Sequence, residues 1–434
     1  MNIPFRKETL ANGLDVLLHE DRACPIVAVN VWFHVGSKNE RTGHTGFAHL
    51  FEHLMFEGSQ HYDRGYFQPL QGAGATLNGS TNADRTNYWE VVPSGAFELA
   101  LWMESDRMGY LLPALTQAKF ANQRDVVLNE RRQNYENRPY GLAPMALVAA
   151  LFPDDHPYHW TTIGEIADLQ AVQLDEVQAF FRRYYHPANA SITLAGDIDT
   201  GEAIALVDSY FGDIEPGERV DPVRATASLD RDVRIQFEDR VELPRLYLAW
   251  LTPAMFADGD ADLDLATDLL ANGKTSRLYK RLVFDERIAT DVSASQNSRE
   301  IAGYTQITAT AAPGHTLGEL ERAIMEEIAR VAAEGPTDEE IERGRVQAEA
   351  QFMFRLQTVG GFGGKSDQLN AYNVFLRDPA YFDRDLQRYQ VVTRSSLRAA
   401  VDTYLDPRRR VTLSIVPKDR PHLAAPDSRT AVVS

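Results

Sequence analysis

The chain has 434 residues, of which 44% are hydrophobic and 24% are charged. This length and composition predict a globular protein of about two to four domains and exclude disordered, collagen-like and disulfide-rich classes. The formal net charge is −18, so the chain would repel phosphate backbones and anionic lipid, and we expect no nucleic-acid partner. No run of about eighteen apolar residues occurs, which indicates a soluble protein without a membrane-spanning segment.

The first residues carry neither the basic segment nor the apolar segment that forms an export signal. Two compartments are therefore open: either the protein is cytosolic or its export signal has been removed. The one cysteine, Cys24, cannot form a disulfide within the chain, so packing must supply the stability.

In the first half, the pattern predicts strands mixed with runs of helices, which indicates an α+β fold. Asn12-Gly13 lies between two strand-like segments and is a strong hairpin signal, because both residues tolerate positive φ angles. Residues 26–35 alternate apolar and polar side chains, as a strand with one buried face does. Apolar spacing predicts helices at about 46–57, 94–111, 116–135, 142–151 and 174–184, and a strand at 191–195.

A stretch rich in proline, glycine and charge, residues 211–223, indicates a linker between two domains. We place the first domain at 1–213, the linker at 214–225 and the second domain at 226–434.

A short pattern recurs in the second half. The stretch Tyr184-Tyr-His-Pro187 leads into a predicted strand, and the stretch Tyr404-Leu-Asp-Pro407, about 220 residues later, does the same. One local match leaves open whether the two halves arose by duplication.

The stretch His49-Leu-Phe-Glu52-His53 points to metal chemistry. Residues four apart on a helix lie on one face, so both imidazoles can face one cation with Glu52 beside them. This H-x-x-E-H order is the signature of the inverted zincins. Two neutral imidazoles and one carboxylate suit zinc and leave a fourth position for water. Glu52 can then accept a proton from that water, whose pKa zinc lowers to about 7, and deliver it to a leaving amine.

A structural role for these histidines stays open on the residues alone. A pattern with three fixed positions also arises by chance, and two histidines on an apolar helix can be buried, hydrogen-bonded groups. No other histidine has a histidine partner four residues away. A third ligand would therefore have to be a carboxylate from elsewhere in the chain.

Over nearly its whole length, the chain resembles the pitrilysin/insulinase family of inverted-zincin metallopeptidases, and most closely the subfamily of mitochondrial processing peptidase and its bacterial relatives. The resemblance implies a zinc endopeptidase with one Zn²⁺ per chain. The ligands would be His49, His53 and a glutamate 77 residues beyond the second histidine, which is Glu130, and Glu52 would be the catalytic residue. It also implies two similar halves, each a mixed sheet covered by helices, and a clam-like chamber closed with a second subunit around an unfolded peptide.

The stretch Asn78-Gly79-Ser80-Thr81 resembles the edge strand of this family, to which a substrate backbone adds as an extra strand. Edge strands present unpaired donors and acceptors that a peptide can use. The alternative is an ordinary hairpin of the core. We expect these four residues to bind substrate.

Two departures from the family bear on function. Gln123 stands where the family commonly has a second glutamate, so the support of the metal site should be weaker. The Arg and Tyr that hold the substrate and steady the oxyanion are replaced by Val283 and Thr290, and neither side chain can donate as that pair does. The resemblance then implies a heterodimer, whose partner subunit lacks the zinc motif and carries the Arg/Tyr pair.

The competing hypothesis is a non-catalytic scaffold or assembly subunit of the same fold, because the family includes such subunits in respiratory complexes. For bacterial relatives of this type, the resemblance favours the periplasm, with the cytoplasm as the alternative.

Residues Gly360 to Ser366 look like a phosphate-binding loop, but Val359 stands where the P-loop requires glycine. We expect a flexible connection between helices that lines the substrate chamber.

Overall fold

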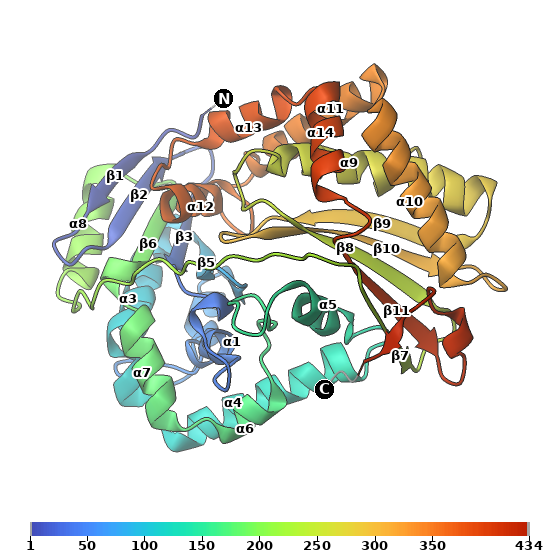
Figure 1. Ribbon diagram of the computed structural model, residues 1–434. Coiled ribbons are helices and arrows are strands. Elements are labelled where there is room, and N and C mark those ends of the chain that lie inside the picture. The colour runs from blue at the N-terminus through green and yellow to red at the C-terminus, as the bar shows by residue number, and fades with distance from the viewer. Residues whose placement is uncertain (1, 432–434) are drawn as a thin grey trace. The chain divides into compact units, whose positions relative to one another are not determined.

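The computed structural model describes residues 2–431, and the strands of this part of the chain form two six-stranded sheets (Figure 1). Both sheets contain parallel and antiparallel pairs and carry helices on their faces, which confirms the α+β class. The strands of the first sheet are β1 (Arg6–Thr9), β2 (Asp15–Glu20), β3 (Ile26–Phe33), β4 (Thr76–Thr81), β5 (Thr86–Pro93) and β6 (Ala190–Gly196). The strands of the second sheet are β7 (Val233–Asp239), β8 (Arg245–Thr252), β9 (Ala289–Asn297), β10 (Gly303–Ala311), β11 (Val411–Pro417) and β12 (Arg429–Thr430).

The first sheet has the order β1-β2-β6-β3-β5-β4, so β4 is an edge strand. The hairpin of β1 and β2 is confirmed, and Gly13 in its turn has φ of +88°, which glycine adopts without strain. The alternation of β3 predicts one buried face, but every residue after Ile26 is buried. Asn30 is buried because α12 (Lys365–Leu376) covers the second face, and Asn370 donates from Nδ2 to the Asn30 carbonyl oxygen at 2.8 Å.

The second sheet repeats this plan in the order β12-β7-β11-β8-β10-β9. β7 and β11 are parallel, as β2 and β6 are, and the next three pairs are antiparallel in both sheets. The outermost strand differs, because β12 runs parallel to β7 whereas β1 runs antiparallel to β2. The two halves are therefore similarly built, as the recurring pattern and the family resemblance predict.

The predicted helical segments of the first half each contain a helix, and the predicted strand at 191–195 is β6. The α-helices of the first half are α1 (Phe47–Leu54), α2 (Phe67–Gly72), α3 (Phe97–Ala114), α4 (Gln117–Arg131), α5 (Ala143–Leu151), α6 (Ile166–Ala171), α7 (Leu174–Tyr184) and α8 (Thr200–Phe211). Those of the second half, besides α12, are α9 (Asp260–Ala271), α10 (Leu317–Glu334), α11 (Asp338–Arg355), α13 (Phe382–Gln390) and α14 (Arg394–Tyr404).

Packing divides the chain into two units, each with one sheet. The first unit comprises Met1–Asn129, Thr162–Val223 and Ala350–Arg384, and the second comprises Glu130–Thr161, Arg224–Glu349 and Asp385–Ser434. Each unit thus includes a helix from the other half of the sequence: α12 packs on β6 and β3 in the first unit, and α5 packs on β11 and β8 in the second.

The predicted boundaries at 1–213, 214–225 and 226–434 describe halves of the sequence and stay a prediction. Residues 215–230 contain neither helix nor strand. Met1 and residues 432–434, at the ends of the predicted domains, lie outside the described residues.

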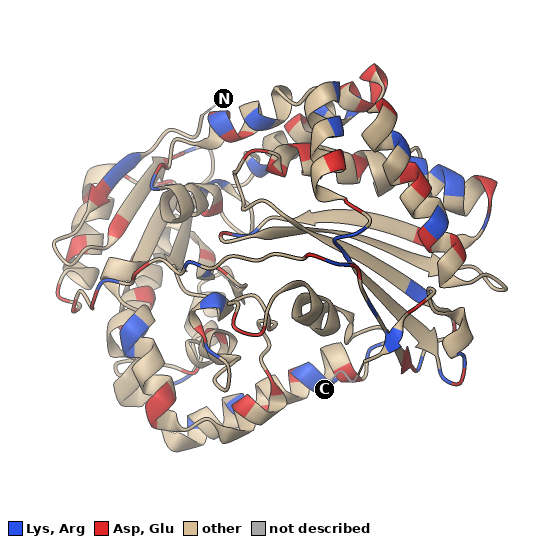
Figure 2. Ribbon diagram, viewed as in Figure 1, with Lys and Arg blue, Asp and Glu red and all other residues tan. Residues whose placement is uncertain are grey.

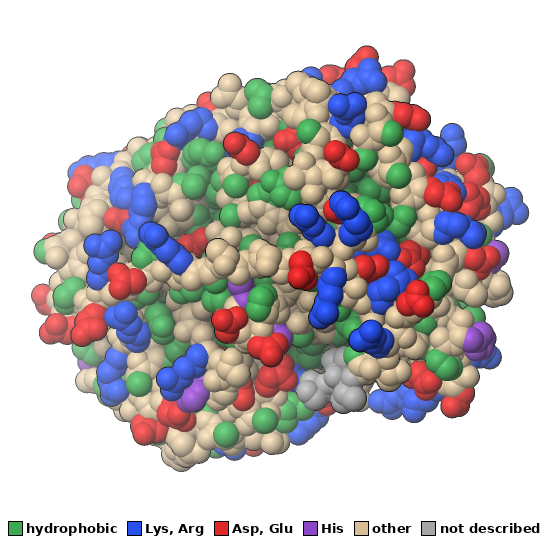
Figure 3. Space-filling model, in the orientation of Figure 1, with side chains coloured by type: hydrophobic (Ala, Val, Ile, Leu, Met, Phe, Trp, Pro, Cys, Tyr) green, Lys and Arg blue, Asp and Glu red, His purple; other side chains and the backbone are tan. Residues whose placement is uncertain are grey.

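Charged residues lie mainly on the helices and loops, and the strands are largely uncharged (Figure 2). On the face drawn in Figure 3, acidic and basic side chains are interspersed, without a large patch of one sign. Among the described residues, no helix is long and apolar enough to cross a membrane.

Candidate metal centre

Helix α1 carries the H-x-x-E-H sequence, and its start is fixed by Gly46 and Glu40. Gly46 has φ of +87°, and a Cβ there would lie 3.0 Å from the Ile163 carbonyl oxygen, so glycine suits this position. The Glu40 carboxylate accepts from the backbone N–H of Gly46 at 2.9 Å and of Ala48 at 2.8 Å. An anion at a helix N-terminus satisfies open N–H groups and interacts favourably with the helix dipole.

The apolar stripe of α1 is buried and holds the helix in place. Phe47, Ala48, Leu50, Phe51 and Leu54 make up this stripe. The Phe51 ring packs against Phe181 and Tyr185 at the end of α7, with ring centroids 5.5 and 5.1 Å apart. The Tyr185 hydroxyl also donates to the Ala48 carbonyl oxygen at 3.4 Å. The face that carries the two histidines is therefore presented from a firmly packed helix.

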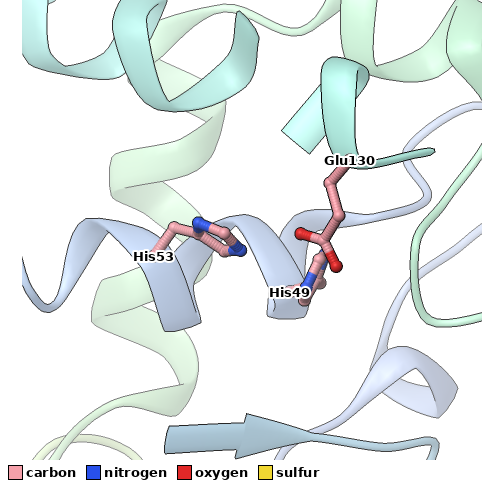
Figure 4. A group of neighbouring side chains, drawn as sticks. All are labelled: His49, His53 and Glu130. Atoms are coloured by element: carbon pink, nitrogen blue, oxygen red, sulfur yellow. The ribbon is translucent and has the colours of Figure 1, made fainter. Parts of the chain in front are cut away.

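The two imidazoles and the Glu130 carboxylate converge. One possible ligand atom from each of His49, His53 and Glu130 lies within 4.8 Å of the others. The two rings are 4.9 Å apart and nearly perpendicular, and Figure 4 shows rings and carboxylate turned toward a common space. Among residues 2–431, this is the one such group of three or more His, Cys, Asp or Glu side chains.

Helix α4 positions Glu130. Its buried residues Phe120, Val127 and Leu128 face the interior. The Gln123 amide donates to the Glu57 carboxylate at 2.5 Å, which ties α4 to the turn after α1. The first packing unit includes α4 as far as Asn129, and Glu130 is the next residue of the same helix. A short π-helix, Arg132–Glu136, follows directly; such turns are frequent at functional sites.

The donor set fits zinc. Zinc takes imidazole nitrogen and carboxylate oxygen at about 2 Å in tetrahedral geometry, so its ligand atoms lie within about 4 Å of one another. Small side-chain adjustments from the observed arrangement therefore suffice. Three protein ligands leave one position open, which is typical of catalytic rather than structural sites.

A pocket of about 560 Å³ adjoins the site, and the site residues Glu52 and His53 line it. Its aromatic wall is formed by Phe56, Tyr66 and Phe67. The remaining lining residues are mostly polar, namely Glu57, Arg64, Gly65, Gln68, Asn78 and Gln123. The chain therefore offers a carboxylate and an imidazole at the mouth of a cavity that can take a side chain.

Sequence reasoning missed Glu57, which follows His53 by four residues and has the spacing of one helical turn. This spacing is the signal that could have found it. The resemblance predicts a glutamate at Gln123, and the structure places the Glu57 carboxylate beside the Gln123 amide. Tyr135, in the π-helix after α4, lies near Glu130: burial, and next the Glu130 carboxylate, raise the pKa of its phenol.

Behind the aromatic wall lies a buried charge cluster. The Arg107 guanidinium contacts the rings of Tyr66 and Tyr88, 4.0 and 4.2 Å from their centroids. It also donates from Nε to Glu104 at 2.8 Å. Burial, and next the adjacent Glu104 carboxylate, raise the pKa of Glu90 well above its usual value. Arg107 and Glu104 form a buried ion pair, and burial tolerates a paired charge better than a lone one.

The four predicted substrate residues lie on β4, at the open edge of the first sheet. Asn78 lines the same pocket as Glu52 and His53. At Gly79 a Cβ would lie 3.1 Å from the Tyr88 ring, so glycine permits close packing. Ser80 donates to Asn87 at 2.7 Å, and Thr81 donates to Thr86 at 3.4 Å.

Val283 and Thr290 occupy the positions where the resemblance places an Arg/Tyr pair. Val283 is half-buried against the core of the second unit. The Thr290 hydroxyl donates to the Asp291 carboxylate at 3.2 Å or to the Thr310 carbonyl oxygen at 3.4 Å. An arginine and a tyrosine do meet at the other end of β9 and β10, since Arg299 Nη2 donates to the Tyr304 hydroxyl at 3.5 Å.

Comparison with models of protein families shows to which family the chain belongs. The family described as insulinase, peptidase family M16, matches residues 15–158, and the family described as peptidase M16 inactive domain matches residues 171–347. The chain belongs to peptidase family M16. The predicted membership of the pitrilysin/insulinase family is confirmed, whereas the resemblance to the subfamily of mitochondrial processing peptidase stays a prediction.

Relatives of this M16 chain include proteins named as zinc proteases. Zinc protease PqqE of Helicobacter pylori is 27% identical over 362 residues, which are 82% of this chain and 81% of the relative. An uncharacterized zinc protease of Mycobacterium leprae is 28% identical over 338 residues, which are 77% of this chain and 75% of the relative.

Solved structures share the fold. A protease from Helicobacter pylori superposes with a TM-score of 0.88 at 25% identity, covering 96% of this chain and all of that chain. A chain of complex III2 from Candida albicans has a TM-score of 0.81 at 12% identity, covering 95% of each chain, and shows the fold alone.

Proposed function

We propose that this M16 chain is a zinc-dependent endopeptidase that cleaves short or unfolded peptides. The observation that carries the proposal is the convergence of His49, His53 and Glu130 within 4.8 Å, beside a pocket that Glu52 lines. The names of the relatives support zinc as the metal and peptide bonds as the substrate.

His49, His53 and Glu130 would hold the ion, and Glu52 would be the general base and then the general acid. A bound zinc ion lowers the pKa of a water and polarises a carbonyl group. Glu52 takes a proton from the water whose oxygen forms the new bond to the peptide carbonyl carbon. As the carbon–nitrogen bond breaks, Glu52 returns this proton to the departing amine. Because Glu52 and His53 are neighbours on α1, one packed helix positions both groups.

Strand β4 would hold the substrate backbone. Its outer edge is open in the first sheet, and an extended peptide can add to such an edge by main-chain hydrogen bonds. The involvement of Asn78, Gly79, Ser80 and Thr81 is part of this proposal. Asn78 supports it, because it lines the pocket that Glu52 and His53 also line.

A partner subunit would complete the site. Neither the half-buried Val283 nor the Thr290 hydroxyl, which already donates to a carboxylate or a backbone oxygen, can supply a cation and a phenol to an oxyanion. We therefore propose a heterodimer, in which the partner carries the Arg/Tyr pair and both subunits enclose the peptide. Within this proposal the protein acts in the periplasm, with the cytoplasm as the alternative, and cell fractionation separates the two.

The second candidate is a scaffold or assembly subunit without peptidase activity. The fold shared with a chain of complex III2 favours it, as does the match of residues 171–347 to the M16 inactive domain. Retention of two histidines and two glutamates in the arrangement described here favours the peptidase.

Cleavage of an unstructured peptide tests the proposal. We expect the zinc-loaded protein, with its partner present, to cleave the peptide, a chelator to stop cleavage and added zinc to restore it. The Glu52→Gln variant should lose about a hundredfold to ten-thousandfold in kcat, the usual contribution of a general base, while keeping its metal. Cleavage that is insensitive to the chelator, or unchanged in Glu52→Gln, would contradict the proposal.

A further inference from the structure

A second pocket lies at the start of β4, and we call it the Trp89 pocket. It has a volume of about 420 Å³ and is lined on the sheet side by Ile26, Thr76, Trp89 and Val91. The segment 357–361, just before α12, forms the opposite side. All of these residues belong to the first packing unit.

The walls of the Trp89 pocket are largely apolar, with Thr76, Gln357 and Thr358 as uncharged polar lining residues, and carry no uncompensated charge. The charged lining residues are Asp21 and Lys365, and they form an ion pair with Nζ 2.6 Å from the carboxylate. Phe362 extends the apolar surface, with its ring edge-on to Trp89 at 5.4 Å. A Cβ at Gly360 would lie 2.6 Å from the Val91 side chain, so glycine brings the segment close enough to form a wall.

The strand register connects this pocket to the candidate metal centre. Thr76 of β4 pairs with Val91, and Asn78 pairs with Trp89. Alternate residues of a strand face the same side, so Thr76 and Asn78 share the face on which the Trp89 pocket opens. They are about 7 Å apart along the strand. Thr76 lines the Trp89 pocket, whereas Asn78 lines the pocket of Glu52 and His53.

An extended peptide on the outer edge of β4 therefore passes both pockets. A residue of that peptide opposite Thr76 directs its side chain to the same face as Thr76, because directly paired residues share a face. We propose that the Trp89 pocket is a side-chain subsite for an aromatic or branched aliphatic residue of the substrate, two positions along the peptide from the residue opposite Asn78. This inference rests on the proposed function and adds a preference to it.

The lining chemistry favours an apolar occupant over a charged one. An ionised side chain would lie against Ile26, Val91 and Trp89, or would have to compete for the paired Asp21 and Lys365. Burial of an unpaired charge is unfavourable. We therefore expect peptides with a large apolar residue at this position to bind about tenfold to a hundredfold more tightly than matched peptides with aspartate, the range that apolar side-chain pockets provide.

Cys24 supplies a direct readout. It is exposed, it lines the Trp89 pocket, and it is the one cysteine of the chain. The rate at which iodoacetamide alkylates Cys24 can therefore be followed by mass spectrometry of the intact full-length chain. The Glu52→Gln variant, loaded with zinc, keeps the peptide uncleaved, and Cys24→Ser controls for alkylation elsewhere.

The experiment uses two fluorescein-labelled peptides of alanine and serine that differ at one central position, phenylalanine or aspartate. Fluorescence anisotropy measures their binding in parallel with alkylation. We expect saturating phenylalanine peptide to slow alkylation of Cys24 at least tenfold, and the aspartate peptide at the same concentration to slow it about twofold or less, as its tenfold to hundredfold weaker binding requires. Binding of the phenylalanine peptide without protection overturns the subsite and leaves the peptidase proposal intact. No binding of either peptide overturns both.

Two variants at Thr76 provide an independent test. Thr76 is exposed at the edge of the sheet, so a change of side chain there does not disturb the core. Thr76→Trp should fill the pocket and reduce the preference for phenylalanine over aspartate to nearly one, whereas Thr76→Ser should keep the preference. An unchanged preference in Thr76→Trp would overturn the proposal.

Discussion

At the scale of single residues, the two carboxyl groups of Glu52 and Asp264 lie on helices but in different environments. Glu52 lines an open pocket beside an imidazole, where a carboxylate can exchange protons with water. Asp264 of α9 lies in the second unit, and its carboxylate accepts a hydrogen bond from the Tyr389 hydroxyl at 2.7 Å. Burial, and next the nearby Asp260 carboxylate, raise the pKa of Asp264 to about 7.

The raised pKa of Asp264 predicts a pH-dependent stability. Between the ordinary value of 3.8 and about 7, the unfolded chain is ionised at this carboxyl while the folded chain keeps the proton. Folding must then take up a proton, so the free energy of unfolding falls as the pH rises, by about 1.4 kcal/mol per pH unit. Asp264→Asn removes this dependence and keeps an acceptor for Tyr389.

We expect urea unfolding to show Asp264→Asn more stable than the unsubstituted chain at pH 8, with the difference shrinking toward pH 4. The exposed Asp258→Asn serves as the matched control and should follow the unsubstituted chain at both pH values. A difference for Asp264→Asn that does not depend on pH would contradict the assignment.

The sequence predicts the candidate site as far as local spacing reaches. The order of His49, Glu52 and His53 predicts a shared helical face, because residues three or four positions apart lie about one turn apart on the same side of a helix. Glu130 lies 77 residues beyond His53, and only the family resemblance predicts it as a ligand. The contact of Glu57 with Gln123 depends on how two helices pack, which local pattern does not encode.

At the scale of elements, a polar contact holds α12 on the first sheet. The Asp367 carboxylate accepts from Trp32 Nε1 at 2.9 Å, from Asn87 Nδ2 at 3.1 Å and from the Gly363 N–H at 2.8 Å. Asp367 is buried, so loss of its carboxylate would leave these donors without an acceptor. Asn87 in turn accepts from Ser80, which extends the network to β4.

We expect Asp367→Ala to lower the free energy of unfolding by about 1–3 kcal/mol, the cost of buried polar groups left unsatisfied. Asp367→Asn retains one carbonyl acceptor and should lose less. Urea unfolding followed by circular dichroism measures both variants. Equal stability of Asp367→Ala and the unsubstituted chain would show that the polar contact does not hold α12.

Individual elements are predictable here, but their partners in space are less so. The hairpin at Asn12 and Gly13 follows from turn chemistry, and α1 and α7 follow from apolar spacing. The packing of α5 on the second sheet and of α12 on the first joins segments that are far apart in the sequence, so local patterns do not predict it. A polar residue such as Asn30 inside a strand reads as a solvent-facing position, although α12 buries it.

At the scale of the whole molecule, two sheets with the same strand order support the recurring pattern seen in the sequence. One turn motif is a short match, whereas five equivalent strands with matching directions show that the two halves are similarly built. The single group of candidate metal ligands in the described chain includes residues from α1 and α4 of the first half.

The proposed partner subunit predicts weak activity of the isolated chain. An oxyanion donor typically contributes about a hundredfold to a thousandfold in kcat. We expect peptide cleavage by the purified chain to rise at least a hundredfold when the subunit that co-purifies from native extract is added. The zinc content of the chain should not change. Full turnover by the chain alone would exclude the partner requirement.

The central claim is that one ion is held by His49, His53 and Glu130. The most direct measurement is the zinc content of the purified chain and of Glu130→Gln, with Gln123→Glu as a neighbouring control on the same helix. We predict about one zinc per chain, near-complete loss in Glu130→Gln at matched folded content, and retention in Gln123→Glu. Purified, folded chain that contains no zinc and whose peptidase activity is unaffected by chelators would contradict the claim. So would a Glu130→Gln variant that keeps its full zinc content.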